Sequence, residues 1–335
     1  MIGSFSLQGS KRYNEDACVA YEDRNTFTLT VADGHGHSGE GSDCASHCVL
    51  KSQLFTNEIL NSDYALWDES KWVELCTEHY THVHNSYRNF CIEKDPSRFI
   101  DEFGIVRKKK GSPVHSGSTY SRTFTFPVSN GFRTVISYVG DSEIWINGMS
   151  MYEDQSPLSE SVQERLKVIP ESDRMIAVYD KPNEIIQHLP RVFIDGKKDM
   201  KYVSNPGDYN LVPCNARYEP SSYFISPPHL DYMKLGMASS IGDFYCNRMG
   251  LSFKPIVHVI DTDTIPFIVM ASDGVWNTMD KNCIWKSGSF VINGIFDKKS
   301  QSSLEKTVYE LRKLYSIKYG KDKIDDISMA TLYPK

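Results

Sequence analysis

Hydrophobic residues recur along the chain with two spacings, one typical of strands and one typical of helices. Residues 27–32 (FTLTVA) are rich in β-forming side chains and are followed by the glycine-rich DGHGHSGEG, which predicts a buried strand that ends in a loop. In residues 42–60 and 68–91, apolar side chains return every three or four positions. This spacing predicts two amphipathic helices, which we expect to pack antiparallel.

Short strands are predicted in the middle of the chain. Residues 93–115 mix proline, glycine, lysine and aspartate without a period, so we expect a mobile loop there. Strand-forming runs then follow at 120–127, 132–139 and 143–147. Only the tripeptide GDS separates the last two runs, and we expect them to form a β-hairpin.

The second half of the chain contains a long segment with little periodicity. Residues 154–235 are rich in proline, serine, tyrosine and aspartate, with one helix-like stretch near 159–166. This is too long for an ordinary loop, so we expect a surface excursion at about 165–235. Later elements are a predicted strand at 267–271, a helix at 303–319 and a final strand at 327–333. We predict an α+β fold in which residues 1–335 form a single domain, with helices packed on sheets.

Composition and charge exclude several classes of protein. The chain has 335 residues, 40% hydrophobic and 24% charged, as in ordinary globular proteins and unlike disordered or collagen-like chains. With 37 basic and 43 acidic side chains the net charge is −6, which argues against nucleic acid as a partner. No apolar run approaches the ~20 residues of a membrane helix, and no secretory signal begins the chain. We therefore expect a monomer in the cytoplasm or nucleus, without membrane attachment.

The cysteines do not form a recognisable metal or redox motif. Eight are present, with no C-x-x-C pair, so reduced and mostly buried thiols are expected. The densest cluster of zinc-like ligands is CTEHYTHVH, which contains Cys76, His79, His82 and His84. A zinc site there is disfavoured, because zinc ligands usually come from two short-spaced clusters and no second cluster exists.

Acidic residues recur where apolar strand-forming runs end, each beside glycine, serine or another aspartate. These residues are Asp33, Asp141, Asp273 and the pair Asp325 and Asp326, and Glu15 and Asp16 could join them from the first strand. Each one alone fits a turn residue. As a set they predict one shared rim of oxygen ligands, suited to Mg²⁺ or Mn²⁺ rather than to zinc.

A nucleotide-binding interpretation also has to be considered. Gly34, Gly36 and Gly39 satisfy G-x-G-x-x-G after a predicted strand and before a predicted helix. No alternation of strands and helices follows, and Asp33 would place a carboxylate against the pyrophosphate. The context therefore disfavours nucleotide binding.

Eight motifs give the chain a specific resemblance to a known family. It resembles the metal-dependent type 2C (PPM-type) Ser/Thr protein phosphatases, whose motifs occur here in the same order over nearly the whole chain. They are KRYNEDA (11–17), VADGHGHSG (31–39), SGST (116–119), YVGDS (138–142), EDQSPLSESVQERL (153–166), SSIGDF (239–244), ASDGVWN (271–277) and DDISMATL (325–332).

This resemblance implies a fold and a reaction. The fold would be a central sandwich of two antiparallel β-sheets flanked by α-helices, with a metal cluster at one end. The reaction would be hydrolysis of phosphoserine and phosphothreonine in a phosphoprotein substrate, by a water that bridges two Mg²⁺ or Mn²⁺ ions. The resemblance also implies a weaker third metal ion.

The resemblance assigns roles to individual residues. Asp33 would bridge both metals, the Gly34 carbonyl would bind one of them, and Asp273 and Asp325 would complete a site. Glu15 would act through water, and Asp16 would support the ligands. Asp141 would form the third site together with Asp273. His35 occupies the position of the proposed general acid, a role that suits a side chain titrating near neutrality. The alternative for His35 is a loop histidine that caps the following helix.

The departures from the family pattern concern phosphate capture. Lys11 stands where the arginine that binds substrate phosphate is usual, and Arg12 follows one place later. Other departures are Ser239 and Glu143 in place of arginine, Asn277 in place of aspartate, and Asp326 in place of asparagine. Register favours Lys11 as the phosphate ligand, whereas side-chain chemistry favours Arg12, because lysine lacks the bidentate fork of arginine. The alternative function is a catalytically silent scaffold that binds a signalling partner, but such a relative should have lost a direct metal carboxylate, and none is lost.

Overall fold

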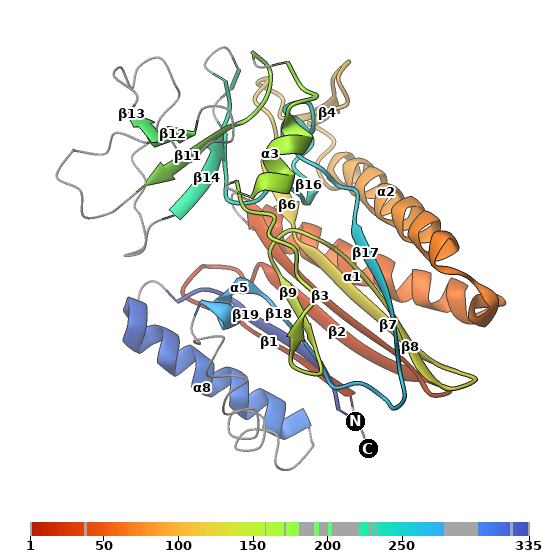
Figure 1. Cartoon of the computed structure of the whole chain (residues 1–335). Helices are drawn as coiled ribbons and strands as arrows, with labels where there is room; N and C mark the ends of the chain where they lie inside the picture. The colour runs from red at the N-terminus through yellow and green to blue at the C-terminus, as the bar shows by residue number, and fades with distance from the viewer. Residues whose placement is uncertain are drawn as a thin grey trace. The chain divides into compact units, whose positions relative to one another are not determined.

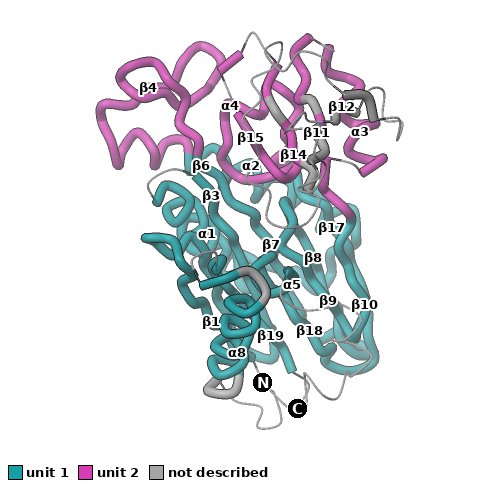
Figure 2. Tube along the Cα trace, turned by 90° about the vertical axis from the view of Figure 1, so that its left-hand side faces the viewer, with its two compact units in different colours: residues 1–87, 116–153, 254–335 teal, residues 88–115, 154–253 magenta. Residues whose placement is uncertain are grey.

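A computed structural model describes most of the chain (Figure 1). The described residues are 2–36, 39–157, 159–170, 172–180, 191–193, 200–202, 221–227, 230–231, 233–277, 301–321 and 324–333. They divide into two compact units, shown in different colours in Figure 2. Unit 1 comprises Met1–Tyr87, Ser116–Glu153 and Lys254–Lys335, and unit 2 comprises Arg88–His115 and Asp154–Phe253. The expectation that residues 1–335 form a single domain stays a prediction.

Two antiparallel sheets form unit 1. In the first sheet the strand order is β1 (Ile2–Leu7), β19 (Ile327–Leu332), β18 (Ile268–Ala271), β9 (Glu143–Ile146) and β10 (Met149–Ser150). In the second sheet β3 (Thr26–Gly36) pairs with β2 (Asp16–Asp23), β6 (Ser116–Ser118) and β7 (Tyr120–Val128), followed by β8 (Gly131–Val139) and β17 (Ile256–Thr262). These antiparallel pairings do not fit the alternating strands and helices that a dinucleotide site requires.

The hydrophobic core of unit 1 lies between the two sheets. Phe27, Leu29 and Val31 of β3 pack in one buried cluster with residues of β9, β18 and β19, such as Met270. Thr28 and Thr30 alternate with them and bond to α1 instead. A strand that points alternate side chains to opposite faces produces this division. The predicted sandwich of two antiparallel sheets is confirmed.

Helices cover the outer faces of the sandwich. Helices α1 (Glu40–Leu60) and α2 (Glu69–Lys94) contribute Phe55 and Trp72 to a cluster with Phe124 of β7. Helix α8 (Gln301–Tyr319) packs Leu304 and Val308 against β18 and β19 of the other sheet (Figure 1). The three helices predicted from the apolar spacing at 42–60, 68–91 and 303–319 are therefore confirmed. None of the described helices is both long and apolar enough to cross a membrane.

The predicted hairpin at 132–147 is wrong. Strand β8 pairs with β7 and β17, whereas β9 pairs with β18 and β10 in the other sheet. The GDS tripeptide is instead a corner between the sheets, where Gly140 has a φ of 89°. A Cβ at Gly140 would lie 2.6 Å from Cγ2 of Thr119, so only glycine fits. Strand β8 instead forms a hairpin with β7, closed by Val128 opposite Gly131.

Two predicted loops contain regular structure. Strand β3 does not end at residue 32 but continues to Gly36, because the glycine-rich segment pairs with β6. Residues 93–115 contain the end of α2 and a short pairing of β4 (Phe99–Ile100) with β5 (Val106–Arg107). Ile105 and Val106 are buried there, so the unstructured loop expected at 93–115 is wrong.

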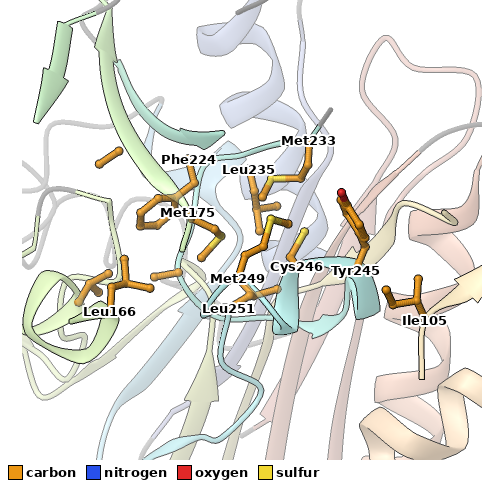
Figure 3. Close-up of a cluster of buried hydrophobic side chains, with 13 residues drawn as sticks. Ile105, Leu166, Met175, Phe224, Met233, Leu235, Tyr245, Cys246, Met249 and Leu251 are labelled. Atoms are coloured by element: carbon orange, nitrogen blue, oxygen red, sulfur yellow. The ribbon is translucent and has the colours of Figure 1, made fainter. Parts of the chain in front are cut away.

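Unit 2 has its own small core. Its sheet has the order β13 (Met200–Tyr202), β12 (Arg191–Phe193), β11 (Ile176–Asp180), β14 (Ser221–Ile225) and β15 (Lys234–Leu235). Leu166 of α3 (Glu160–Leu166), Phe224, Met249 of the segment after α4 (Phe244–Asn247) and their neighbours form one buried cluster (Figure 3). The helix predicted near 159–166 is confirmed. Much of the excursion at 165–235 lies outside the described residues, and its role stays a prediction.

Candidate active site

Two carboxylates face each other at one end of the β2–β3 pair. Asp16, the first residue of β2, lies directly opposite Asp33 of β3 in the antiparallel register. Like charges placed directly opposite on neighbouring strands are destabilising. The chain therefore holds these two residues together at the expense of stability.

Backbone contacts fix the position of Asp33. Its N–H donates to Oγ1 of Thr119 at 2.8 Å, and its carbonyl accepts from the N–H of Thr119 at 2.9 Å. Thr119 is held in turn by a 2.7 Å hydrogen bond between its hydroxyl and that of Ser142. Next to Asp33, the N–H of Gly34 donates to the Glu15 carbonyl at 2.9 Å. A Cβ at Gly34 would lie 2.5 Å from that carbonyl oxygen, so this close approach requires glycine.

Asp273 reaches the same region from another part of the chain. Asp273 follows β18 as the first residue of the short helix α5 (Asp273–Trp276), and Nδ2 of Asn277 donates to its Oδ2 at 3.0 Å. The next residue, Gly274, lies so close to β19 that a Cβ would be 2.1 Å from the Asp326 carbonyl oxygen. The close approach of the two segments therefore places Asp273 beside the start of β19.

Asp326 has a structural role that the sequence analysis missed. Its Oδ1 accepts the N–H of Gly9 at 2.7 Å, and its Oδ2 accepts the N–H of Glu15 at 2.8 Å. One carboxylate thus ties the segment between β1 and β2 to the start of β19. The sequence signal was the aspartate at a position where the resembling family usually has asparagine.

The surrounding carboxylates strongly perturb Asp33. Its pKa is raised well above the ordinary value, first by burial and then by the negative charges of Asp16, Asp273, Asp325 and Asp141. These four residues come from four separate segments of the chain. The electrostatic coupling therefore shows that the fold brings together the acidic residues found at strand ends in the sequence.

Asp16 is perturbed in the same direction. Its pKa is raised to about 8, chiefly by burial, with the Ser272 hydroxyl lowering it and the carboxylates of Asp326, Asp325 and Asp273 raising it. Among the described residues, neither carboxylate oxygen of Asp16 has a hydrogen-bond partner of good geometry. A buried carboxylate in this state needs either a proton or a nearby cation.

Lys11 and Arg12 lie in different environments. Nζ of Lys11 is 3.0 Å from Oε2 of Glu15 and 3.4 Å from Oδ1 of Asp325. Burial opposes its charge, but the carboxylates of Asp325, Glu15 and Asp33 outweigh burial and raise the Lys11 pKa above its ordinary value. The Arg12 guanidinium lies over the ring of Tyr13, 5.3 Å from its centroid. Lys11 is therefore the one of the two that contacts the acidic cluster.

His35 lies on the same strand as Asp33, not in a loop. It is partly exposed on β3, opposite Gly117 of β6. Burial raises the pKa of Asp141, and the charge on His35 counteracts this rise. Helix α1 begins after Gly39, which has a left-handed backbone with a φ of 82° and makes no side-chain cap itself. The two roles considered for His35, general acid and helix cap, both stay predictions.

The donors at this site fit a hard divalent cation by charge and chemistry. In the described part of the chain, no group of three His, Cys, Asp or Glu side chains is arranged closely enough to hold a metal ion as it stands. The grouped side chains are nevertheless carboxylates, the ligands that Mg²⁺ and Mn²⁺ prefer, and positive charge would relieve the repulsion felt by Asp33 and Asp16. The match between this site and a divalent cation therefore rests on the type and the charge of its ligands.

Three of the four residues in the zinc-like cluster, Cys76, His79 and His84, are buried, whereas His82 is exposed. Cys76 is fully buried against the sheet, and the ring of His79 stacks on Phe55 at a centroid distance of 4.1 Å. Nε2 of His79 is engaged with the hydroxyl of Tyr120 at 2.8 Å. These side chains serve packing rather than metal binding.

The comparisons with known proteins agree with the fold. No family model matches the chain. A probable protein phosphatase 2C 72 of Arabidopsis thaliana is 25% identical over 98% of this chain and 83% of its own length. A probable protein phosphatase 2C 52 of the same plant is 31% identical over 98% of this chain and 64% of its own length. A crystal structure of serine-threonine phosphatase 2C from Toxoplasma gondii superimposes with a TM-score of 0.60 at 13% identity, covering all of this chain and 94% of that one.

Two antiparallel sheets with helices on their outer faces are also the fold of the similar type 2C phosphatase structure. This chain is a homologue of the metal-dependent type 2C Ser/Thr protein phosphatases and has their fold. The resemblance inferred from the eight motifs is confirmed.

Proposed function

We propose that this chain is a protein phosphatase that hydrolyses phosphoserine and phosphothreonine in proteins with the help of divalent metal ions. The chain's homology to protein phosphatases 2C supports this reaction over a silent scaffold. The residues that would hold the ions are Asp33, Gly34, Asp273 and Asp325, with Glu15 acting through water, Asp16 in support and Asp141 contributing to a weaker third site. When bound, two Mg²⁺ or Mn²⁺ ions would activate a water for attack and neutralise charge on the phosphoryl group.

The observation that carries the proposal is the gathering of acidic residues from separate segments: Asp16 lies opposite Asp33 in the β2–β3 register, and Nζ of Lys11 lies 3.0 Å from Glu15 and 3.4 Å from Asp325. Like charges brought together from separate segments raise the free energy of the fold, so their gathering is not explained by stability. Strongly perturbed carboxylates cluster at functional sites. A silent scaffold has no need of this arrangement, yet Asp33, Asp273 and Asp325 are all present.

Lys11 is the residue we assign to the substrate phosphate. Its ammonium group lies at the acidic cluster, whereas Arg12 stacks on Tyr13. Lysine offers a single point charge where arginine would offer a bidentate fork. We therefore expect weaker phosphate binding, seen as a raised KM, with a smaller effect on kcat.

His35 is the residue we assign to protonation of the leaving group. A seryl or threonyl alkoxide is strongly basic, so its departure is helped by a proton donor within reach. His35 is partly exposed, and it lies close enough to Asp141 to influence its titration.

Hydrolysis of a phosphothreonine peptide tests the proposal. Phosphate release should require Mn²⁺ or Mg²⁺, stop with EDTA, and be lost in Asp273→Asn, whereas Asp23→Asn, at the far end of β2, should retain it. A folded protein that binds Mn²⁺ and releases no phosphate would favour the silent scaffold. A monomeric state and a location in the cytoplasm or nucleus stay predictions.

A further inference from the structure

Lys11 forms a bifurcated ion pair with two residues of the acidic cluster. Its Nζ lies between Oε2 of Glu15 at 3.0 Å and Oδ1 of Asp325 at 3.4 Å. The two carboxylate side chains are only 9% and 10% exposed, while the Lys11 side chain is 41% exposed. The Lys11 side chain therefore bridges two mostly buried anions while it remains partly exposed to solvent.

The backbone around Lys11 is held in place, so a change in its contacts has to come from its side chain. Asp326 accepts the N–H of Gly9 on one side and the N–H of Glu15 on the other. Lysine has a flexible four-carbon stem and three rotatable donors. Its ammonium group can thus change partners while the segment stays anchored to β19.

We propose that Lys11 is an internal counter-ion of the carboxylate cluster, which metal ions displace so that its ammonium group becomes available to the substrate phosphate. The inference rests on the proposed function, because it assumes that Asp325 binds a metal ion and that Glu15 acts on one through water. It goes further by linking the loading of metal to the capture of phosphate through one side chain. An arginine fork at this position would not exchange partners so easily, because its planar geometry favours fixed bidentate pairs.

Electrostatics predicts that Lys11 competes with metal ions, whereas metal ions and phosphate strengthen each other's binding. Before metal binds, the ammonium group neutralises part of the cluster and competes with the entering cation, so it weakens metal affinity. After metal binds, like charges repel Lys11 from the cluster, and phosphate offers it a new anionic partner. Because coupling between two ligands is reciprocal, phosphate should in turn strengthen metal binding in the wild-type chain.

Calorimetric titration of Mn²⁺ into the full chain tests the inference, with Lys11→Met as the variant and Arg12→Met as the matched control. Without phosphate, Lys11→Met should bind Mn²⁺ about tenfold more tightly than wild type, within the range typical of coupled sites. Orthophosphate should tighten Mn²⁺ binding in wild type and in Arg12→Met, and it should have a much smaller effect in Lys11→Met. Equal or weaker Mn²⁺ binding by Lys11→Met in the absence of phosphate would overturn the proposal.

Thermal unfolding in EDTA separates this inference from the proposed function. If Lys11 is the counter-ion, Lys11→Met should unfold at a lower temperature than Arg12→Met in EDTA, and Mn²⁺ should remove the difference. If neither wild type nor the variants bind Mn²⁺, the proposed metal site is wrong, and the unfolding temperatures in EDTA alone test Lys11 as a counter-ion. Equal unfolding temperatures of the two variants in EDTA would overturn that role as well.

Discussion

Asp16 of β2 and Asp33 of β3 lie directly opposite each other, and the pKa of each is raised by burial and by neighbouring carboxylates. The pair has a consequence for stability, because a carboxyl group whose pKa is higher in the folded state binds its proton more tightly there than in the unfolded chain. The stability provided by this proton is full below the unfolded pKa near 4 and is lost as the pH rises toward the folded pKa of Asp16, about 8.

The metal-free protein should therefore become less stable between pH 5 and pH 8. Each such group can lower the free energy of unfolding by at most about 1.4 kcal/mol per pH unit. Thermal unfolding in EDTA should show the decline, and saturating Mn²⁺ should suppress it, since a cation replaces the proton. Asp16→Asn should flatten the profile, whereas Asp63→Asn, at an exposed position, should leave it unchanged. A profile that rises from pH 5 to pH 8 in EDTA would contradict the coupling.

Asp33→Asn should weaken metal binding and at the same time stabilise the metal-free protein. Loss of the central charge should weaken Mn²⁺ affinity by at least about 100-fold, as judged from the effect of ligand-shell mutations. The same change should raise the unfolding temperature in EDTA, because it removes the repulsion with Asp16. Calorimetry and thermal unfolding measure the two effects on one sample. Unchanged Mn²⁺ binding by the variant would rule out Asp33 as a ligand.

His35→Ala should act most strongly on substrates with poor leaving groups. General acid catalysis is typically worth 10²–10⁴-fold when the departing oxygen is basic, so turnover of alkyl phosphates should fall by roughly that range. p-Nitrophenyl phosphate has an acidic leaving group and should lose much less. Steady-state kinetics on both substrates make the comparison within one variant. Equal losses would mean that His35 only shapes the strand end.

Much of the sandwich could be predicted from the sequence, because two-residue alternation such as Phe27, Leu29 and Val31 directly encodes a buried face. The corner at Gly140 could not, since a short glycine-containing link fits both a hairpin and a crossing between sheets. The choice depends on β9 pairing with β18, which is more than 100 residues away. Long-range pairing of this kind leaves no local signal.

The candidate site, like the fold, could be predicted only in part from the sequence. Aspartates at strand ends indicated the acidic cluster, because a carboxylate leaving water needs a compensating partner. The different environments of Lys11 and Arg12 depend on the path of one short segment, and that path is set by Asp326. Register favoured Lys11 only weakly, whereas its distances to Glu15 and Asp325 distinguish it clearly from Arg12.

Asp326→Asn should destabilise the protein even though it removes a negative charge from the cluster. Asparagine has one acceptor oxygen, so it can keep only one of the hydrogen bonds from Gly9 and Glu15 and would present an N–H group to the other donor. The expected loss is about 1–3 kcal/mol in the free energy of unfolding. Urea unfolding at pH 6 is suitable, because Asp16 is then largely protonated and the gain from relieved repulsion is small. A variant as stable as wild type would show that the two contacts do not anchor the segment.

Arg122 allows a prediction far from the acidic cluster. This residue of β7 is 1% exposed, and its guanidinium donates to the hydroxyls of Ser52 at 3.2 Å and Thr56 at 3.0 Å. Its charge lies between the rings of Phe55 and Phe124, at 4.8 and 5.6 Å, and no carboxylate of a described residue pairs with it. A buried charge without an ionic partner is tolerated only while hydrogen bonds and stacking compensate for its lost hydration.

Arg122→Lys should consequently be more damaging than Arg122→Met. Lysine would keep the buried charge but lose the planar face between the two rings and the fork that reaches both hydroxyls, so we expect a loss of about 3–5 kcal/mol. Methionine would remove the cost of burying a charge and still fill most of the space, and the hydroxyls of Ser52 and Thr56 would keep their contacts with Thr30 and Thr28. We expect it to lose only about 1–2 kcal/mol. Urea unfolding of the two variants decides the order. A lysine variant that equals or exceeds the methionine variant in stability would mean that an anion or an ordered water compensates for the buried charge at this position, because only then would keeping the charge be an advantage.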